Sequence, residues 1–261
     1  MKEKTTYIFI ILSVVVAFLA GVVWTKREKG EKVKTVEKVE EGTPTQPVFS
    51  PPKSEKPQVK FFVMSFCPYG NQAEEGLGPV YNLLKDKVDW QPRYVIYKNY
   101  CSQAPDKKTC EKDYCLKTGS ETFCSMHGLG ELNQNIREIC AFNLGETWKW
   151  WQFVAGVNAN CSAQNVDTTW EKYAQEAGLA VDKIKSCQKD EAFSLIEKET
   201  AEMEKYQVQG SPMVFINDKI YDGGRAPEDY KKAICSAFSA EPSECQTVLS
   251  ATSTGAGGGC Q

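Results

Sequence analysis

The sequence has no excess of positive charge: its formal net charge is -3 and its pI is about 5.5. Proteins that bind nucleic acid through its phosphates need clustered lysine and arginine to neutralise them. The composition therefore argues against a nucleic-acid partner.

The sequence also lacks a Cys-x2-Cys pair, and His127 is its single histidine. Structural zinc sites are usually built from closely spaced cysteine pairs, often with histidine as a further ligand. We therefore expect no metal site, and we expect the protein to work without a cofactor.

Cysteine, by contrast, is abundant: the chain has 11, all but one of them between Cys101 and Cys260. In a reducing cytosol so many thiols would be open to oxidation, whereas in an oxidising compartment they form stabilising disulfides. The count predicts a disulfide-rich domain outside the cytoplasm.

After a short tail at residues 1–6, residues 7–24 form an apolar run that is long enough to cross a bilayer as a helix. A cleaved signal peptide is the alternative, but its apolar region is usually shorter and no small-x-small cleavage site is evident. We therefore expect an uncleaved, single-pass signal-anchor.

The orientation of this anchor involves a conflict between two signals. More lysine and arginine residues follow the apolar run at residues 7–24 than precede it. The positive-inside rule alone would therefore place the large domain in the cytoplasm. The cysteines indicate the extracytoplasmic side. We give them more weight, because the rule weakens for long domains.

Three further regions follow the anchor. Residues 25–57 are charged, rich in proline and almost without apolar periodicity, which is typical of an extended linker. Residues 58–239 have the patterning of a globular domain, with a helical insertion at about 98–206. Residues 240–261 are rich in serine, threonine and glycine, and we expect a flexible tail there.

The patterning of the globular region alternates between strand and helix signals, which indicates an α/β fold. We expect strands at residues 59–64, 88–97, 213–216 and 219–221. We expect helices at residues 68–85, 131–144, 147–157, 167–177, 182–205 and 229–238.

Cys67 lies where the first strand gives way to a helix. A thiolate at a helix N-terminus faces unpaired backbone N–H groups and the positive end of the helix dipole, both of which stabilise it. Pro68 fits the first helical position, where its missing N–H costs nothing. We interpret Cys67 as the nucleophile; a buried, inert cysteine is the alternative.

The motif Phe66-Cys67-Pro68-Tyr69, followed far along the chain by Gly210-Ser211-Pro212, resembles the thioredoxin superfamily. The helical insertion makes the chain similar to the DsbA-type branch, over about residues 58–238. The resemblance implies a thioredoxin fold, a cis peptide bond before Pro212, and a substrate peptide bound by the backbone around Ser211. An ordinary loop proline is the alternative for Pro212.

A second motif begins at His127-Gly128 and continues with Glu131, Asn135 and Glu138. It is similar to the signature of gamma-interferon-inducible lysosomal thiol reductases, although two of that signature's cysteines are missing here. His127 is therefore either an acid–base group or a histidine that caps and packs within the insertion.

Gly70 is the main departure from the resemblance, because thiol oxidoreductases of this group usually carry a second cysteine there. Pro68, Tyr69 and Gly70 would thus shape the surroundings of a single active cysteine. Release of a mixed disulfide would need a second substrate thiol, a small thiol, or another cysteine such as Cys260.

The parity of the cysteines fits this arrangement, because ten remain for five disulfides if Cys67 stays reduced. Cys235 with Cys245 is the expected local pair.

These observations together predict a membrane-tethered, extracytoplasmic thiol–disulfide exchange protein. Its partners would be proteins that contain thiols or disulfides, with a small thiol or a membrane redox protein as a further partner. The alternative is a non-catalytic peptide-binding or chaperone module on the same fold.

Overall fold

The computed structural model describes residues 49–252. The expected anchor at residues 7–24, most of the expected linker, and Cys260 lie outside these residues. Within residues 49–252, none of the helices combines the length and the apolar character that a membrane crossing requires.

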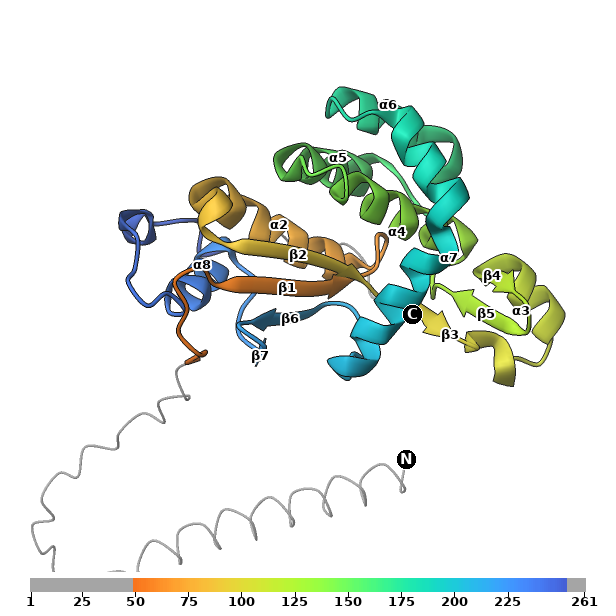
Figure 1. Ribbon diagram of the computed structural model, residues 1–261, viewed down its shortest axis with the longest axis horizontal. Coiled ribbons are helices and arrows are strands. Elements are labelled where there is room, and N and C mark those ends of the chain that lie inside the picture. The colour runs from red at the N-terminus through yellow and green to blue at the C-terminus, as the bar shows by residue number, and fades with distance from the viewer. Residues whose placement is uncertain (1–48, 253–261) are drawn as a thin grey trace, which may run out of the picture. The chain divides into compact units, whose positions relative to one another are not determined.

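A four-stranded sheet forms the centre of the domain, with the strand order β2-β1-β6-β7 (Figure 1). Its strands are β1 (Gln58–Val63), β2 (Asp89–Tyr94), β6 (Met213–Ile216) and β7 (Lys219–Tyr221). β1 pairs in parallel with β2 and antiparallel with β6, and β6 continues into β7 as a hairpin. The expected α/β fold is confirmed, and each expected strand lies in or beside one of these.

Apolar side chains on both faces of β1 explain why it is the central strand. Val59, Phe61 and Val63 belong to the large core under the helices, whereas Phe62 packs with Phe215 on the opposite face. Successive side chains of a strand point to opposite faces of its sheet. A strand buried on both faces needs a mostly apolar sequence, and Val59–Val63 is apolar except for Lys60, which pairs with Glu202.

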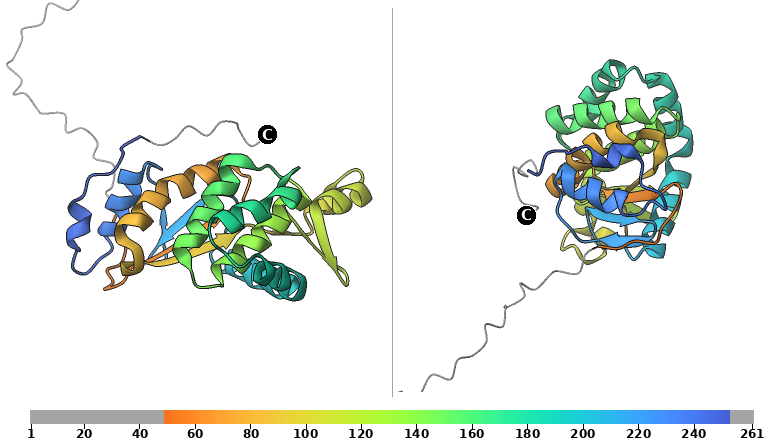
Figure 2. Two further views of the ribbon diagram at one scale, coloured as in Figure 1. Left: turned by 90° about the horizontal axis from the view of Figure 1, so that it is seen from above. Right: turned by 90° about the vertical axis from the view of Figure 1, so that its left-hand side faces the viewer.

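The helices flank this sheet, and α2 and α8 pack side by side (Figure 2). Six long helices take part: α2 (Pro68–Leu84), α4 (Leu129–Phe142), α5 (Thr147–Asn160), α6 (Val166–Glu176), α7 (Val181–Lys205) and α8 (Pro227–Cys235). All six were predicted from the sequence, with boundaries shifted by a few residues.

The insertion between β2 and β6 is not wholly helical, and the prediction is corrected here. A three-stranded sheet of order β3-β5-β4 joins β3 (Tyr97–Lys98), β4 (Cys115–Thr118) and β5 (Glu121–Cys124), with α3 (Lys107–Tyr114) beside it. The strands are too short for an apolar alternation to be visible in the sequence.

Both boundaries of the globular domain differ from the expected ones. At the start, Phe49 packs against Tyr221, and Ser54 exchanges backbone hydrogen bonds with the segment at Ala237 and Ser239. At the end, the 3-10 helix η3 (Ser243–Gln246) is part of the fold. The domain therefore includes residues that composition alone assigned to the linker and the tail.

Within residues 49–252, four disulfides join eight cysteines: Cys101–Cys110, Cys115–Cys124, Cys140–Cys187 and Cys235–Cys245. The expected Cys235–Cys245 pair is confirmed. Cys67 and Cys161 take part in none of the four. The predicted fifth disulfide would need Cys260, so it stays a prediction.

Candidate active site

Cys67 is the N-cap of α2, one turn after the end of β1. Its backbone N–H donates to the carbonyl of Met64 at 3.0 Å, and its own carbonyl accepts from Asn71 N–H at 2.9 Å. Pro68 is the first residue of the helix. The strand therefore delivers the thiol to the helix end, as the sequence predicted, but the side chain is only 1% exposed.

The loop before β6 brings Ser211 and Pro212 to Cys67 from 144 residues away. The peptide bond between Ser211 and Pro212 is cis. Cys67 Sγ lies 3.5 Å from the Ser211 carbonyl oxygen, to which it donates, and Ser211 Oγ accepts from the backbone N–H of Met64 at 3.0 Å. The structure thus brings together the expected nucleophile and the expected substrate-binding pair.

Tyr69 and Gly70 lie in the first turn of α2, directly after Cys67 and Pro68. Tyr69 is 41% exposed, with the guanidinium of Arg225 5.3 Å from its ring centre. Gly70 is buried, and a Cβ on it would lie 2.6 Å from Ser211 Oγ. Tyr69 therefore forms part of the exposed surface of the site, whereas Gly70 allows Ser211 to lie close to α2.

Glu131, in the first turn of α4, ties the loop before Cys67 to the insertion. The carboxylate is fully buried and accepts from Phe66 N–H at 2.8 Å. It also accepts from the hydroxyl of Ser125 and lies 2.8 Å from His127 Nδ1. One side chain of the insertion therefore fixes the residue before the nucleophile and the single histidine.

His127 is half-buried and held by this carboxylate. The hydrogen bond to Glu131 raises the pKa of the imidazole above its usual value, against the opposing effect of burial. The hydrogen bond to Glu131 therefore stabilises the imidazolium form relative to that of a free histidine. This arrangement agrees with the packing role that the sequence left open.

Asn135 and Glu138 extend the same face of α4 beneath Ser65. Asn135 Oδ1 accepts from both the backbone N–H and the hydroxyl of Ser65, at 3.0 and 2.7 Å. Glu138 Oε2 lies 3.1 Å from the same hydroxyl. Because this carboxyl is fully buried, desolvation raises its pKa to about 7.

Glu74, on α2, is a second buried carboxyl in this region. Burial, followed by the charge of Glu138, raises its pKa well above the usual value. The Asn158 side chain donates to one of its oxygens at 2.7 Å. Two carboxyls that resist ionisation therefore lie behind the active-site loop, where each disfavours the charged form of the other.

A cavity of about 380 Å³ opens beside the residues that flank Cys67. Phe66 and Pro68 line one part of it, and His127, Asn158 and Cys161 line another. Cys161 is half-buried, and burial raises the pKa of its thiol. A larger cavity, about 730 Å³, has no residue of the Cys67 site in its wall.

The described part of the chain contains one group of three or more side chains that could together bind a metal ion, and all of its members are cysteines. The sulfurs of Cys101, Cys115 and Cys124 lie within 4.8 Å of one another. All three are in disulfides, and a disulfide sulfur lacks the thiolate charge that binds a metal ion.

Sequence reasoning assigned no site role to Glu74, Glu131, Asn135, Glu138 or Cys161. Three of them were visible as members of the motif that begins at His127. Their spacing at positions 131, 135 and 138 places them on one face of a helix. Glu74 and Cys161 carried no comparable signal.

The fold and this site define the class of the protein. Parallel β1 and β2, antiparallel β6 and β7, a cysteine at the N-terminus of α2 and a cis-proline beside it together form a thioredoxin-like domain. More specifically, the chain belongs to the family of vacuolar sorting receptor thioredoxin-like domains, whose model matches residues 81–235. That span contains the insertion and Pro212 but begins after Cys67.

One curated relative is vacuolar-sorting receptor 5 of Arabidopsis thaliana, which is 29% identical over 156 residues. The match covers 51% of this chain but 24% of the receptor. The chain therefore spans about a quarter of the length of that relative.

Solved structures similar to this chain include thiol–disulfide oxidoreductases of bacteria. DsbA from Mycobacterium tuberculosis (reduced) has a TM-score of 0.47 and 19% identity, covering 77% of this chain and 90% of that one. BdbD from Bacillus subtilis has a TM-score of 0.47 and 14% identity, covering 71% and 89%. The family model confirms the expected thioredoxin-like domain.

Proposed function

We propose that this protein is a membrane-tethered, extracytoplasmic thiol–disulfide exchange protein with Cys67 as its nucleophile. The contact of Cys67 Sγ with the Ser211 carbonyl, 3.5 Å away and next to the cis bond of Pro212, carries the proposal. It places a thiol at a helix N-terminus beside a backbone carbonyl that can pair with an extended peptide.

The chemistry is an exchange of sulfur partners. The Cys67 thiolate attacks one sulfur of a substrate disulfide, a mixed disulfide forms, and the other substrate sulfur leaves as a thiolate. Gly70 supplies no second thiol, so a further thiol must attack the mixed disulfide to release Cys67. That thiol comes from the substrate, from a small molecule, or from another cysteine of this chain such as Cys260 or Cys161.

A second candidate function is peptide binding without redox turnover. Two observations favour it: Cys67 is 1% exposed, and the family that the chain belongs to is named for sorting receptors. In this function Ser211 and Pro212 would bind the backbone of a partner protein, and the thiol would be a relic.

Mixed-disulfide trapping distinguishes the two functions. The full chain in detergent is incubated with a peptide that carries an activated disulfide, quenched with acid and mapped by mass spectrometry. Exchange predicts an adduct on Cys67 that is lost in Cys67→Ser and retained in Cys161→Ser. Peptide binding of equal affinity in the wild type and in Cys67→Ser, with no adduct on Cys67, would favour the second function.

The membrane tether is tested separately, in sealed vesicles that contain the full chain. Protease added on the extracytoplasmic side should remove the domain at residues 49–252 and leave residues 7–24 with the membrane. Protection of the domain in intact vesicles would contradict the proposed orientation.

A further inference from the structure

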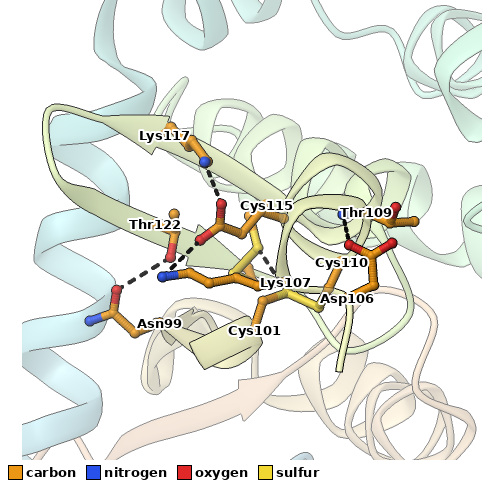
Figure 3. The surroundings of a disulfide bond; sticks show 11 residues. Asn99, Cys101, Asp106, Lys107, Thr109, Cys110, Cys115, Lys117 and Thr122 are labelled. Carbon is orange, nitrogen blue, oxygen red and sulfur yellow. Dashed lines mark hydrogen bonds and ion pairs between the residues drawn. A yellow bond between two sulfur atoms is a disulfide. The ribbon is translucent and has the colours of Figure 1, made fainter. Parts of the chain in front are cut away.

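We propose that the disulfides Cys101–Cys110 and Cys115–Cys124 form a second thiol–disulfide exchange centre. When a thiol cleaves the Cys101–Cys110 bond, the Cys101 thiolate in turn cleaves the Cys115–Cys124 bond. This centre is separate from Cys67 and does not depend on the function proposed for it. Cys115–Cys124 joins β4 to β5 of the small sheet, and Cys101–Cys110 joins the 3-10 helix η2 (Tyr100–Gln103) to α3 beside it (Figure 3).

The distance between the two disulfides is the first observation. Cys101 Sγ and Cys115 Sγ are 3.6 Å apart. Neither atom carries a hydrogen, because each is already bonded to another sulfur, so this is a direct contact between sulfur atoms. A thiolate formed at Cys101 is thus already beside the sulfur that it would attack. Figure 3 shows the two bonds side by side.

The second observation is the unequal exposure of the four cysteines. Cys110, on the exposed helix α3, is half-buried. Cys101, Cys115 and Cys124 are only 1%, 6% and 0% exposed. A thiol from solution therefore reaches Cys110 in preference to the other three. Attack on Cys110 makes Cys101 the leaving group, which is the sulfur in contact with the second disulfide.

The exchange then balances without any oxidant. A small or protein thiolate bonds to Cys110, the bond between Cys101 and Cys110 breaks, and Cys101 leaves as a thiolate. The Cys101 thiolate bonds to Cys115, the bond between Cys115 and Cys124 breaks, and Cys124 becomes the new thiolate. One thiol enters, one thiol is released, and the number of disulfide bonds is unchanged.

The released thiol lies at a position that matters for the Cys67 site. Cys124 ends β5 and precedes Ser125, whose hydroxyl donates to the carboxylate of Glu131. The same carboxylate accepts from Phe66 N–H, next to Cys67. Loss of the Cys115–Cys124 bond therefore frees the end of a strand that helps to hold Glu131.

The other two disulfides provide an internal comparison. Cys140–Cys187 and Cys235–Cys245 lie in different parts of the fold, and no sulfur contact links either of them to another disulfide of the described cysteines. We therefore expect a thiol formed at one of these bonds to remain where it forms.

The test uses the full chain in detergent with Cys67→Ser, so that the chemistry of Cys67 cannot scramble the result. Adding Cys110→Ser leaves Cys101 as a thiol without any external reagent. Acid quenching, alkylation and mass spectrometry should then find a Cys101–Cys115 link with alkylated Cys124, in on the order of a tenth of the molecules or more. An intact Cys115–Cys124 bond in all molecules would overturn the proposal, as would a Cys101–Cys124 link.

The matched control replaces Cys101 in place of Cys110. Cys67→Ser with Cys101→Ser leaves a thiol at Cys110, whose sulfur is outside the group formed by the sulfurs of Cys101, Cys115 and Cys124 within 4.8 Å of one another, and Cys115–Cys124 should stay intact. Equal scrambling in both variants would show general unfolding of the small sheet and would overturn the proposed direction of transfer.

A second measurement avoids substitution in the centre itself. The Cys67→Ser chain, with its disulfides intact, is treated with limiting reduced glutathione. The proposal predicts a glutathione adduct on Cys110 together with a Cys101–Cys115 link. An adduct on Cys110 with a free Cys101 thiol and an intact Cys115–Cys124 bond would overturn it.

Discussion

The hydroxyl of Ser211 occupies the space that a side chain on Gly70 would need. An ideal Cβ on Gly70 would lie 2.6 Å from Ser211 Oγ, well inside normal contact distance. The same hydroxyl is fixed by the backbone N–H of Met64, 3.0 Å away. Glycine at position 70 and serine at position 211 are therefore complementary, and a second cysteine at position 70 would have to displace this hydroxyl.

This complementarity predicts that substitutions at the two positions are coupled. Gly70→Ala should lower the free energy of unfolding by about 1–3 kcal/mol, because the added methyl group collides with Ser211 Oγ. In a Ser211→Ala background the cost should fall by about 1 kcal/mol or more, because the colliding atom is gone. Denaturant unfolding of all four proteins of the cycle measures the coupling. Additive effects would contradict the collision.

The single histidine gives a direct probe of the Glu131 cluster. The hydrogen bond to Glu131 raises the pKa of His127 above its usual 6.5, so we expect the imidazole signal in NMR to titrate above that value. The pair stabilises the folded protein fully below pH 6.5, and this contribution is lost as the pH rises through the folded-state pKa. Glu131→Gln should lower the pKa of His127. An unchanged titration in that variant would contradict the pairing.

The buried carboxyl of Glu138 should make the stability of the protein depend on pH. Burial raises the pKa of its carboxyl from 4.5 to about 7. Between these values the folded protein keeps a proton that the unfolded chain releases, so the free energy of unfolding should fall by about 3 kcal/mol as the pH rises from 4.5 to 7. Glu138→Gln should flatten this slope, because an amide does not titrate, and Gln134 can still donate to the amide oxygen.

The control for Glu138 is the exposed residue Glu241. Glu241→Gln should leave the slope of stability against pH as it is in the wild type. Equal flattening in both variants would show that the slope does not arise from the buried carboxyl.

Two disulfides of different loop length should differ in their effect on stability. Cys140–Cys187 closes a sequence separation of 47, and Cys235–Cys245 closes one of 10. Loop-closure entropy gives about 4 and about 3 kcal/mol for their removal by paired Cys→Ser substitutions. Denaturant unfolding should therefore find the Cys140–Cys187 variant less stable by about 1 kcal/mol. The reverse order would contradict an entropic origin.

Much of the fold was predictable because its elements carry strong local patterns. The apolar run at β1 and the helical periodicity of α4 to α7 are long enough to be unambiguous. The small sheet of the insertion was missed for the opposite reason: β3 to β5 span two to four residues each. Its strands are held by pairing and by the Cys115–Cys124 disulfide, which no local pattern specifies.

The candidate site divides in a similar way. Cys67, Pro68, Ser211 and Pro212 were identified from their motifs, and the structure brings them together. The support of the loop by Glu131 was not identified as such, although its motif was noticed. A motif shows only which residue types occur at which spacing. The hydrogen bond from Phe66 N–H to Glu131, 65 residues away, depends on the tertiary fold.

The sequence alone determined that a cysteine ends a buried strand and begins a proline-led helix, that no second cysteine follows at Gly70, and that Cys235 and Cys245 are close enough to pair. These are properties of neighbouring residues, and local sterics and helix geometry decide them. Only the tertiary structure decided that Ser211 fills the space beside Gly70 and that the sulfurs of Cys101 and Cys115 touch. Such contacts join residues distant in sequence, and the packing of the whole domain sets their distances.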